Sequence, residues 1–146
     1  MLKIAHRGNI NGPDLENENT IKTIFTALGK GFDVEIDVWV IDGIIYFGHD
    51  RPQEIIDQFI IDKINTCGWF HCKNIEALLF FSNNYDRLNY FWHEKDSYAL
   101  TSFNYIWTYP GKIITPRSIL VDLNMSNLKS YNIEPYGICT DYPSLL

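Results

Sequence analysis

Two acidic residues two positions apart, Glu35 and Asp37, are the first feature of this 146-residue sequence that could support chemistry. They lie in the segment 33–40, whose alternating pattern is typical of a β-strand. Residues i and i+2 of a strand point to the same side of a sheet, so both carboxylates could offer oxygens to one divalent cation. The alternative is a polar residue satisfied inside the core, because buried carboxylates are either paired or bound to metal.

Three of the four histidines occupy related positions. His6, His49 and His71 lie at or near the ends of predicted strands, as do Lys73 and Asp141. In a β/α barrel the carboxyl ends of the strands open onto one face, where active sites are built. An imidazole titrates near neutral pH, so one histidine can take a proton from an attacking hydroxyl while another protonates a leaving oxygen.

The elements that must position these side chains alternate between strands and helices. Apolar residues at i, i+3, i+4 and i+7 predict the first helix, which Asn17 or Asn19 would cap. The predicted helices cover 21–28, 55–64 and 74–81, and the predicted strands cover 2–5, 33–40, 44–50, 69–73, 88–93, 105–109, 118–122 and 137–141. Such alternation implies parallel β/α units. We therefore expect an α/β fold over residues 1–146 as a single domain, a reduced TIM-type β/α barrel with several outer helices missing in the C-terminal half.

Composition excludes several classes of protein. Hydrophobic residues make up 46% of the chain and charged residues 21%, which favours a packed core over disorder. The net charge of −6, without a run of Lys or Arg, argues against a nucleic-acid partner. No secretion signal and no apolar stretch of ~18 residues is visible, so we expect a soluble protein without a transmembrane segment. Cys67, Cys72 and Cys139 lack metal-ligand spacing and predict free thiols in a reducing, cytoplasmic compartment.

Several short motifs follow one another along the chain. They are His6-Arg7-Gly8, Glu18-Asn19-Thr20, Glu35-Ile36-Asp37-Val38, Asp42-Gly43, His49-Asp50, Lys73 and Gly137-Ile138-Cys139-Thr140-Asp141-Tyr142-Pro143. Their order resembles that of the glycerophosphodiester phosphodiesterase family over the whole chain, most specifically in its first third. Helix capping explains Glu18-Asn19-Thr20 as well as function does, but it does not explain His6, Arg7 and His49.

The resemblance implies a metal-dependent phosphodiesterase that acts on a glycerophosphodiester or another small phosphodiester substrate. The site residues that it implies are His6 and His49 as general acid and base, Arg7, Lys73 and Trp107 as substrate contacts, Glu35 and Asp37 as metal ligands, and Glu18 in a supporting role. Cations are needed because negative charge builds up in the transition state of phosphodiester cleavage. Trp107 fits a core position equally well.

Two features depart from the family pattern. The family's third metal ligand is a glutamate two residues before the strand lysine, and His71 stands at this position. The resemblance implies Mg²⁺ or Ca²⁺ as the divalent metal ion, but an imidazole ligand shifts the preference toward Mn²⁺ or Zn²⁺. The chain is also shorter than the ~200 residues that a β/α barrel usually needs.

Two other functions fit the same residues. A barrel that kept the phosphate site without turnover would be a binding or regulatory module. A metal-independent lyase would form a cyclic phosphate with Arg7 and His71 as its cations.

Aromatic residues concentrate between Trp69 and Tyr109. Without outer helices, the later barrel strands would expose an aromatic patch larger than soluble monomers usually tolerate. We therefore expect a homodimer through the aromatic C-terminal half, with folding of 94–104 and 110–117 over these strands as the alternative. His93 lacks a carboxylate at ligand spacing, so we expect it to be structural or solvent-facing.

Overall fold

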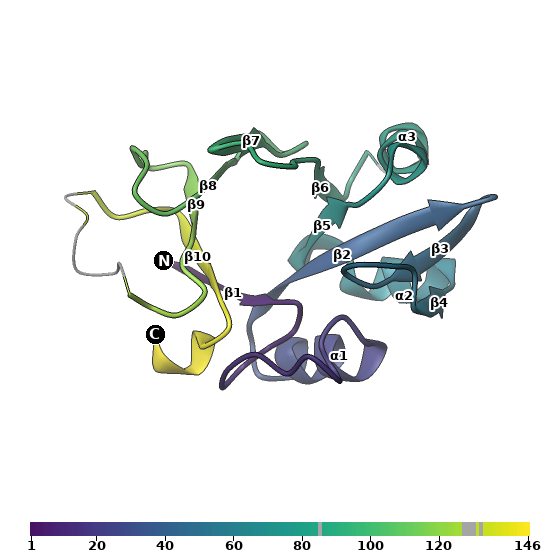
Figure 1. Ribbon diagram of the computed structural model, residues 1–146, viewed down its shortest axis with the longest axis horizontal. Helices are drawn as coiled ribbons and strands as arrows, with labels where there is room; N and C mark the ends of the chain where they lie inside the picture. The colour runs from purple at the N-terminus through teal and green to yellow at the C-terminus, as the bar shows by residue number, and fades with distance from the viewer. Residues whose placement is uncertain (85, 127–130, 132) are drawn as a thin grey trace.

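The computed structural model describes residues 1–84, 86–126, 131 and 133–146. Strands dominate its regular structure (Figure 1). They are β1 (Leu2–His6), β2 (Asp33–Ile41), β3 (Ile44–Phe47), β4 (Glu54–Ile56), β5 (Gly68–Cys72), β6 (Asn89–Phe91), β7 (Tyr98–Leu100), β8 (Ile106–Thr108), β9 (Ser118–Val121) and β10 (Gly137–Thr140). The α-helices are α1 (Ile21–Gly29), α2 (Gln58–Ile64) and α3 (Ile75–Asn84), and two 3-10 turns cover Asn65–Cys67 and Pro143–Leu145.

The strands form one curled, mixed sheet. Parallel neighbours run in the order β6, β5, β2, β1, β10, β9 and β8. The pairs β2–β3, β3–β4 and β7–β8 are antiparallel. The two ends of the curl meet where Ser102, just after β7, donates its backbone N–H to the carbonyl oxygen of Tyr90 in β6, at 2.8 Å (Figure 1). The strands therefore surround a common interior.

The expected TIM-type β/α barrel is wrong, because the described residues form one curled, mixed sheet with few and short α-helices. Helices α1 and α3 pack on β2, and α3 also contacts β5 and β6. Within the described residues, no α-helix follows β6, β8 or β9. The connection 101–105 between β7 and β8 is too short for a parallel crossover, which needs about a dozen residues or more. The antiparallel pair β7–β8 forms there instead of a β/α unit.

Two local expectations in the N-terminal half are also wrong. Thr20, and neither Asn17 nor Asn19, caps α1 through its side chain. The predicted helix 55–64 begins as the strand β4 and continues as α2, whose N-cap is Asp57. Because Thr20 provides the cap, the side chain of Asn19 is available for another contact.

Hydrophobic residues gather on both faces of the curled sheet, because successive side chains of a strand point to opposite sides. The outer cluster lies beneath the helices and includes Ile24, Val34, Ile36, Val38, Phe70, Cys72, Ala77 and Phe81. The inner cluster consists of Ile4, Trp69, Phe91, Ala99, Trp107, Ile119, Val121 and Cys139. Apolar packing therefore covers both faces of the sheet in which β2, the strand of Glu35 and Asp37, lies.

The inner cluster changes the interpretation of the aromatic C-terminal half. Trp107 is 3% exposed and packs against Trp69 and Phe91, with ring centroids 6.0 and 4.6 Å away. It therefore cannot belong to an exposed outer patch, as we had expected. Tyr98 and Leu100 in β7 are exposed. The homodimer through the aromatic C-terminal half stays a prediction.

All three cysteines are free thiols, with Cys72 and Cys139 buried and Cys67 half-buried. Across the described part of the chain, no helix has both the length and the apolar character that spanning a bilayer requires.

Candidate functional site

A layer of polar side chains lies at the carboxyl ends of the parallel strands, next to the inner cluster. Strand alternation places it there, because each polar residue follows an inner apolar residue by two positions. The pairs are Ile4 and His6, Trp69 and His71, Phe91 and His93, Trp107 and Tyr109, and Cys139 and Asp141. Strand β2 adds Glu35 and Asp37 to the same layer. The strand ends therefore bring together most of the predicted site residues.

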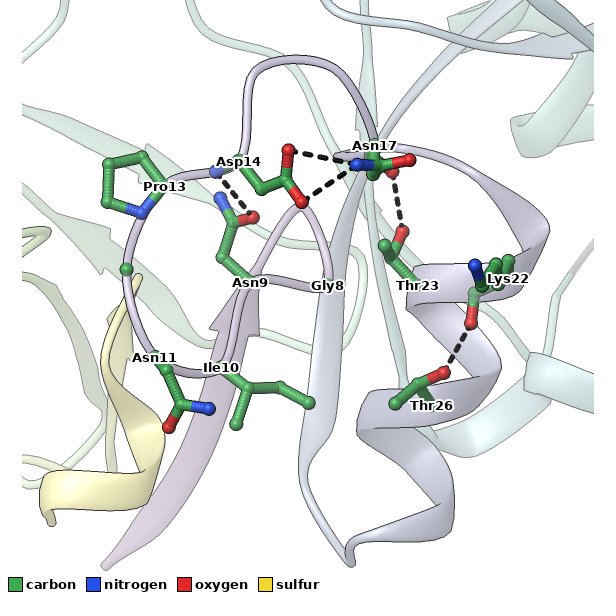
Figure 2. A pocket seen from close by; sticks show the side chains of 11 residues that line it. Gly8, Asn9, Ile10, Asn11, Pro13, Asp14, Asn17, Lys22, Thr23 and Thr26 are labelled. Atoms are coloured by element: carbon green, nitrogen blue, oxygen red, sulfur yellow. Dashed lines mark hydrogen bonds between the residues drawn. The ribbon is translucent and has the colours of Figure 1, made fainter.

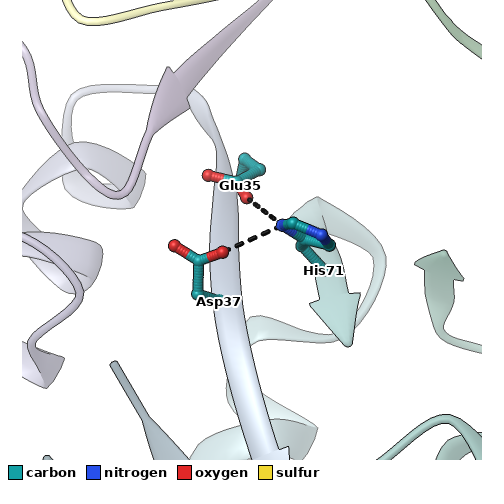
Figure 3. A group of neighbouring side chains, drawn as sticks. All are labelled: Glu35, Asp37 and His71. Carbon is teal, nitrogen blue, oxygen red and sulfur yellow. Dashed lines mark ion pairs between the residues drawn. The ribbon is translucent and has the colours of Figure 1, made fainter. Parts of the chain in front are cut away.

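Three buried side chains form a group that could hold a metal ion (Figure 3). Glu35 and Asp37 come from β2 and His71 from β5, and one ligand atom of each lies within 4.8 Å of the others. The Nδ1 atom of His71 is 2.9 Å from Asp37 Oδ1 and 3.7 Å from Glu35 Oε1. Both carboxylates face the same side of the strand, as i and i+2 residues should.

Both the backbone and the side chain of Asp37 are hydrogen-bonded to Asn19. Its N–H lies in a gap where β1 has already ended and β3 is not yet paired. Asn19 fills this gap, since its Oδ1 accepts the Asp37 N–H at 3.0 Å and its Nδ2 donates to Asp37 Oδ2 at 2.9 Å. The second carboxylate oxygen, Oδ1, is buried, and its nearest charged or polar neighbours are His71 Nδ1 at 2.9 Å and Lys73 Nζ at 3.4 Å. Such an oxygen, beside a second carboxylate and an imidazole, fits a cation ligand.

The two carboxylates of this group respond differently to their surroundings. Burial and the neighbouring charge of Asp37 raise the pKa of Glu35. Burial also acts to raise the pKa of Asp37, but the contacts with His49 and His71 lower it well below its ordinary value. Asp37 is therefore the carboxylate of the pair that ionises first, and Glu35 ionises more easily when a cation is near.

His6 is fixed by Asp141. The Nδ1 atom of His6 lies 2.7 Å from Asp141 Oδ1, and its Nε2 lies 3.9 Å from Glu35 Oε2. Burial lowers the pKa of His6, but the hydrogen bond with Asp141 and the charge of Glu35 raise it overall. Burial acts to raise the pKa of Asp141, and the hydrogen bond from His6 lowers it overall. The result is a histidine–carboxylate pair whose Nε2 faces the metal group.

Arg7 connects several parts of the site. Its Nη1 donates to Glu18 Oε1 at 2.7 Å, and its Nε lies 3.1 Å from Asp37 Oδ2. Its backbone N–H donates to Glu35 Oε2 at 3.2 Å, which the left-handed φ of 51° at Arg7 permits directly after β1. Glu18 also accepts a hydrogen bond from Asn9. Glu18 thus supports the site by anchoring the guanidinium.

His49 lies against Arg7 and Asp37. Its Nδ1 is 2.9 Å from Asp37 Oδ2, and Arg7 Nη2 is 2.7 Å from Nδ1 and 2.9 Å from Nε2. A guanidinium can only donate hydrogen bonds, so a neutral His49 that donates from Nδ1 to Asp37 accepts at Nε2. Arg7 is therefore the residue that lies against Nε2 of His49.

The two other predicted substrate contacts have different surroundings. Lys73 follows β5 directly, and its ammonium group reaches Asp37. Trp107 lies in the inner cluster, which is the core position that the sequence left open as its alternative.

The sequence did not predict that His93 and Tyr109 lie next to the other candidate site residues. The ring of His93 stacks on His71 with centroids 4.3 Å apart, and the Tyr109 hydroxyl is hydrogen-bonded to the His93 ring. Burial and the positive charges of His71 and Lys73 lower the pKa of His93 to about 4. Burial and the charge of Glu35 raise the pKa of Tyr109. The overlooked signal was the spacing of two residues from an inner aromatic side chain.

Two pockets flank this layer. A pocket of about 580 Å³ opens at Arg7 and His49 and is also lined by Arg51. Another, of about 410 Å³, lies between the loop after β1 and α1 and is lined by residues such as Lys22 and Thr26 (Figure 2). The first pocket reaches the basic side chains of the site, so we take it as the candidate substrate pocket. The second contains none of the histidines.

Comparisons of the chain with protein-family models, with curated proteins and with solved structures found no match.

Proposed function

We propose that the protein is a metal-dependent phosphodiesterase that hydrolyses a small phosphodiester, such as a glycerophosphodiester, with His6 and His49 as its acid–base pair. The observation that carries this proposal is the convergence of a buried Glu35–Asp37–His71 group with carboxylate-bound imidazoles and basic side chains at one end of the sheet. Acid–base groups, phosphate-binding cations and metal ligands are the parts that this reaction needs.

In this proposal Arg7 and Lys73 bind the phosphate. Arg7 Nε lies 3.1 Å and Lys73 Nζ lies 3.4 Å from the carboxylate of Asp37, one from each of its oxygens. A phosphodiester bound beside Asp37 would therefore lie within reach of both cations. These cations offset the charge that gathers on the non-bridging oxygens in the transition state.

The two histidines are oriented by carboxylates in the same way. The Nδ1 atom of His6 meets Asp141, and the Nδ1 atom of His49 meets Asp37. A hydrogen bond at Nδ1 sets the tautomer and leaves Nε2 for proton transfer. For His49 this transfer requires Arg7 to turn from the imidazole toward the substrate, and a bound phosphate supplies the competing anion for that movement.

A divalent ion bound by the Glu35–Asp37–His71 group would supply Lewis acidity toward the phosphate oxygens. The buried Oδ1 of Asp37, which faces Nδ1 of His71, fits this ion. The donor set admits Mg²⁺ or Ca²⁺ through its oxygens and Mn²⁺ or Zn²⁺ through its imidazole.

Turnover of bis(para-nitrophenyl) phosphate and of glycerophosphocholine with added Mn²⁺ tests the proposal. We expect the wild-type protein to release product, and His6→Gln and His49→Gln each to lower kcat by roughly 10²-fold or more. The exposed Arg87→Gln variant should keep wild-type turnover, and circular dichroism should show that all variants fold. Near-wild-type kcat in both histidine variants would contradict the acid–base assignment. Binding of the substrates without turnover would favour the phosphate-binding module.

A further inference from the structure

The two ring nitrogens of His71 have different partners. Nε2 lies 3.4 Å from the backbone carbonyl oxygen of His93. A carbonyl oxygen accepts hydrogen bonds and cannot donate them, so Nε2 carries a hydrogen in this contact. Nδ1 faces the carboxylates of Asp37 and Glu35, 2.9 Å from Asp37 Oδ1 and 3.7 Å from Glu35 Oε1. An ionised carboxylate also only accepts hydrogen bonds, so a cation held by the two carboxylates would take the place of a hydrogen on Nδ1, while Nε2 keeps its own.

Aromatic neighbours fix the plane of the His71 ring. Phe91 stacks on it at a centroid distance of 5.1 Å and an interplanar angle of 2°, and His93 at 4.3 Å and 8°. The centroids of Phe91 and His93 are 6.1 Å apart, so both rings lie on the same side of His71. A rotation of the His71 ring out of its plane would break both stacking contacts.

Tyr109 holds His93 from another strand. Its hydroxyl is hydrogen-bonded to Nε2 of His93 and lies 3.2 Å from Nδ1, and the two rings meet edge to face at 5.0 Å. Tyr109 follows β8 and His93 follows β6, and these two strands are not paired with each other. The contact thus joins two strand ends that no ladder connects, and it brings the His93 ring and carbonyl against His71.

We propose that Tyr109 and His93 are positioning residues that present Nδ1 of His71 to the metal ion, and that they thereby make the site selective for transition-metal ions such as Mn²⁺ over Mg²⁺. This inference rests on the metal site of the proposed function and extends it to the class of ion. Imidazole nitrogen favours transition-metal ions, whereas Mg²⁺ and Ca²⁺ are bound mainly by oxygen. Removal of a residue that orients a metal-binding histidine typically lowers metal affinity 10–100-fold.

Calorimetric titration of the full chain with MnCl₂ and with MgCl₂ tests the inference without reference to turnover. We expect the wild-type protein to bind Mn²⁺ more tightly than Mg²⁺. Tyr109→Phe, which removes only the hydroxyl, and His93→Ala should weaken Mn²⁺ binding by about 10-fold or more. Binding of Mg²⁺ should change much less, because it depends on Glu35 and Asp37. Tyr98→Phe, at an exposed tyrosine of β7, is the matched control and should change neither affinity.

Two further measurements separate positioning from folding. His93→Phe keeps a ring against His71 but loses the hydrogen bond to Tyr109, so it replaces His93→Ala if that variant does not fold. Nitrogen-15 NMR of histidine-labelled protein with Zn²⁺ reports which ring nitrogen binds the metal. We expect Nδ1 of His71 to be the ligand in the wild-type protein and its Nε2 to keep its hydrogen.

The outcomes distinguish this inference from the function on which it rests. Unchanged Mn²⁺ affinity in Tyr109→Phe and His93→Phe, or ligation through Nε2 of His71, would overturn the positioning role alone. A wild-type protein that binds neither ion would overturn both proposals. Tight Mn²⁺ binding that depends on Tyr109, in a protein without phosphodiester turnover, would overturn the proposed function and support the positioning role.

Discussion

Replacement of Asp141 by Asn should destabilise the protein in a way that depends on pH. Asn keeps the shape of the side chain and an oxygen for the hydrogen bond from Asn9, but it removes the negative charge beside His6. The His6–Asp141 contact is 2.7 Å long, and the side chains are only 14% and 9% exposed, so solvent screens it little. A charge-assisted hydrogen bond of this kind contributes about 2 kcal/mol to the free energy of unfolding.

The two pKa shifts define the pH range of this contribution. The pKa of His6 is raised, so its share is fully present below about pH 6.5 and is lost as the pH rises through the folded-state pKa. The pKa of Asp141 is lowered, so its share is present above about pH 3.8 and is lost as the pH falls through the folded-state pKa. Wild type and Asp141→Asn should therefore differ most between about pH 4 and pH 6.5.

Urea unfolding at about pH 5.5 and about pH 9, in EDTA, measures this difference. We expect Asp141→Asn to lower the free energy of unfolding by about 2 kcal/mol at the lower pH and by less than about 1 kcal/mol at the higher pH, where His6 is neutral. Asp86→Asn, at an exposed position, should have no such pH-dependent effect. A loss that is equal at both pH values, or larger at about pH 9, would refute the ion pair.

Three other predictions test separate contacts. A lysine at position 7 cannot contact both Glu18 and His49 as the guanidinium of Arg7 does. We therefore expect Arg7→Lys to lower kcat/KM by about 10²-fold in the turnover assay, and an unchanged kcat/KM would contradict a role of Arg7 in phosphate binding. Asn19→Ala leaves the buried N–H of Asp37 without its acceptor and should lower the free energy of unfolding in urea by about 2 kcal/mol. An unchanged midpoint of urea unfolding would contradict this prediction. Sedimentation at micromolar concentration should show the predicted homodimer, and a single species at the 17.1 kDa of one chain would exclude it.

Two elements of the N-terminal half, β2 and α1, could be predicted because they are long enough to show a strand or helix periodicity in their apolar residues. The segment 33–40 alternates and became β2, and the apolar spacing over 21–28 became α1. Strands β6, β7 and β8 are only three residues long. The predicted strands 88–93 and 105–109 contain β6 and β8, but β7 was missed because three residues show no clear alternation. The antiparallel pair that replaces a β/α unit was missed with it.

The candidate site was predictable where strand geometry alone decides it. Glu35 and Asp37 share a face because they are two residues apart in one strand. Asn19 was not predictable, because its contact with Asp37 depends on a gap between two other strands along β2. His93 and Tyr109 depend in the same way on which strand ends become neighbours, and that is a property of the whole curled sheet.

The dependence of phosphodiester turnover on the metal group tests the central claim most directly. The rate of product release is measured after dialysis against EDTA and again after addition of Mn²⁺, for the wild-type protein and for Asp37→Asn. We predict that EDTA abolishes wild-type turnover and that Mn²⁺ restores it. Turnover of Asp37→Asn should not be restored, because this variant removes the carboxylate charge that Asp37 contributes to the metal group. Turnover that persists in EDTA, or that Asp37→Asn retains in full, would contradict a metal-dependent phosphodiesterase.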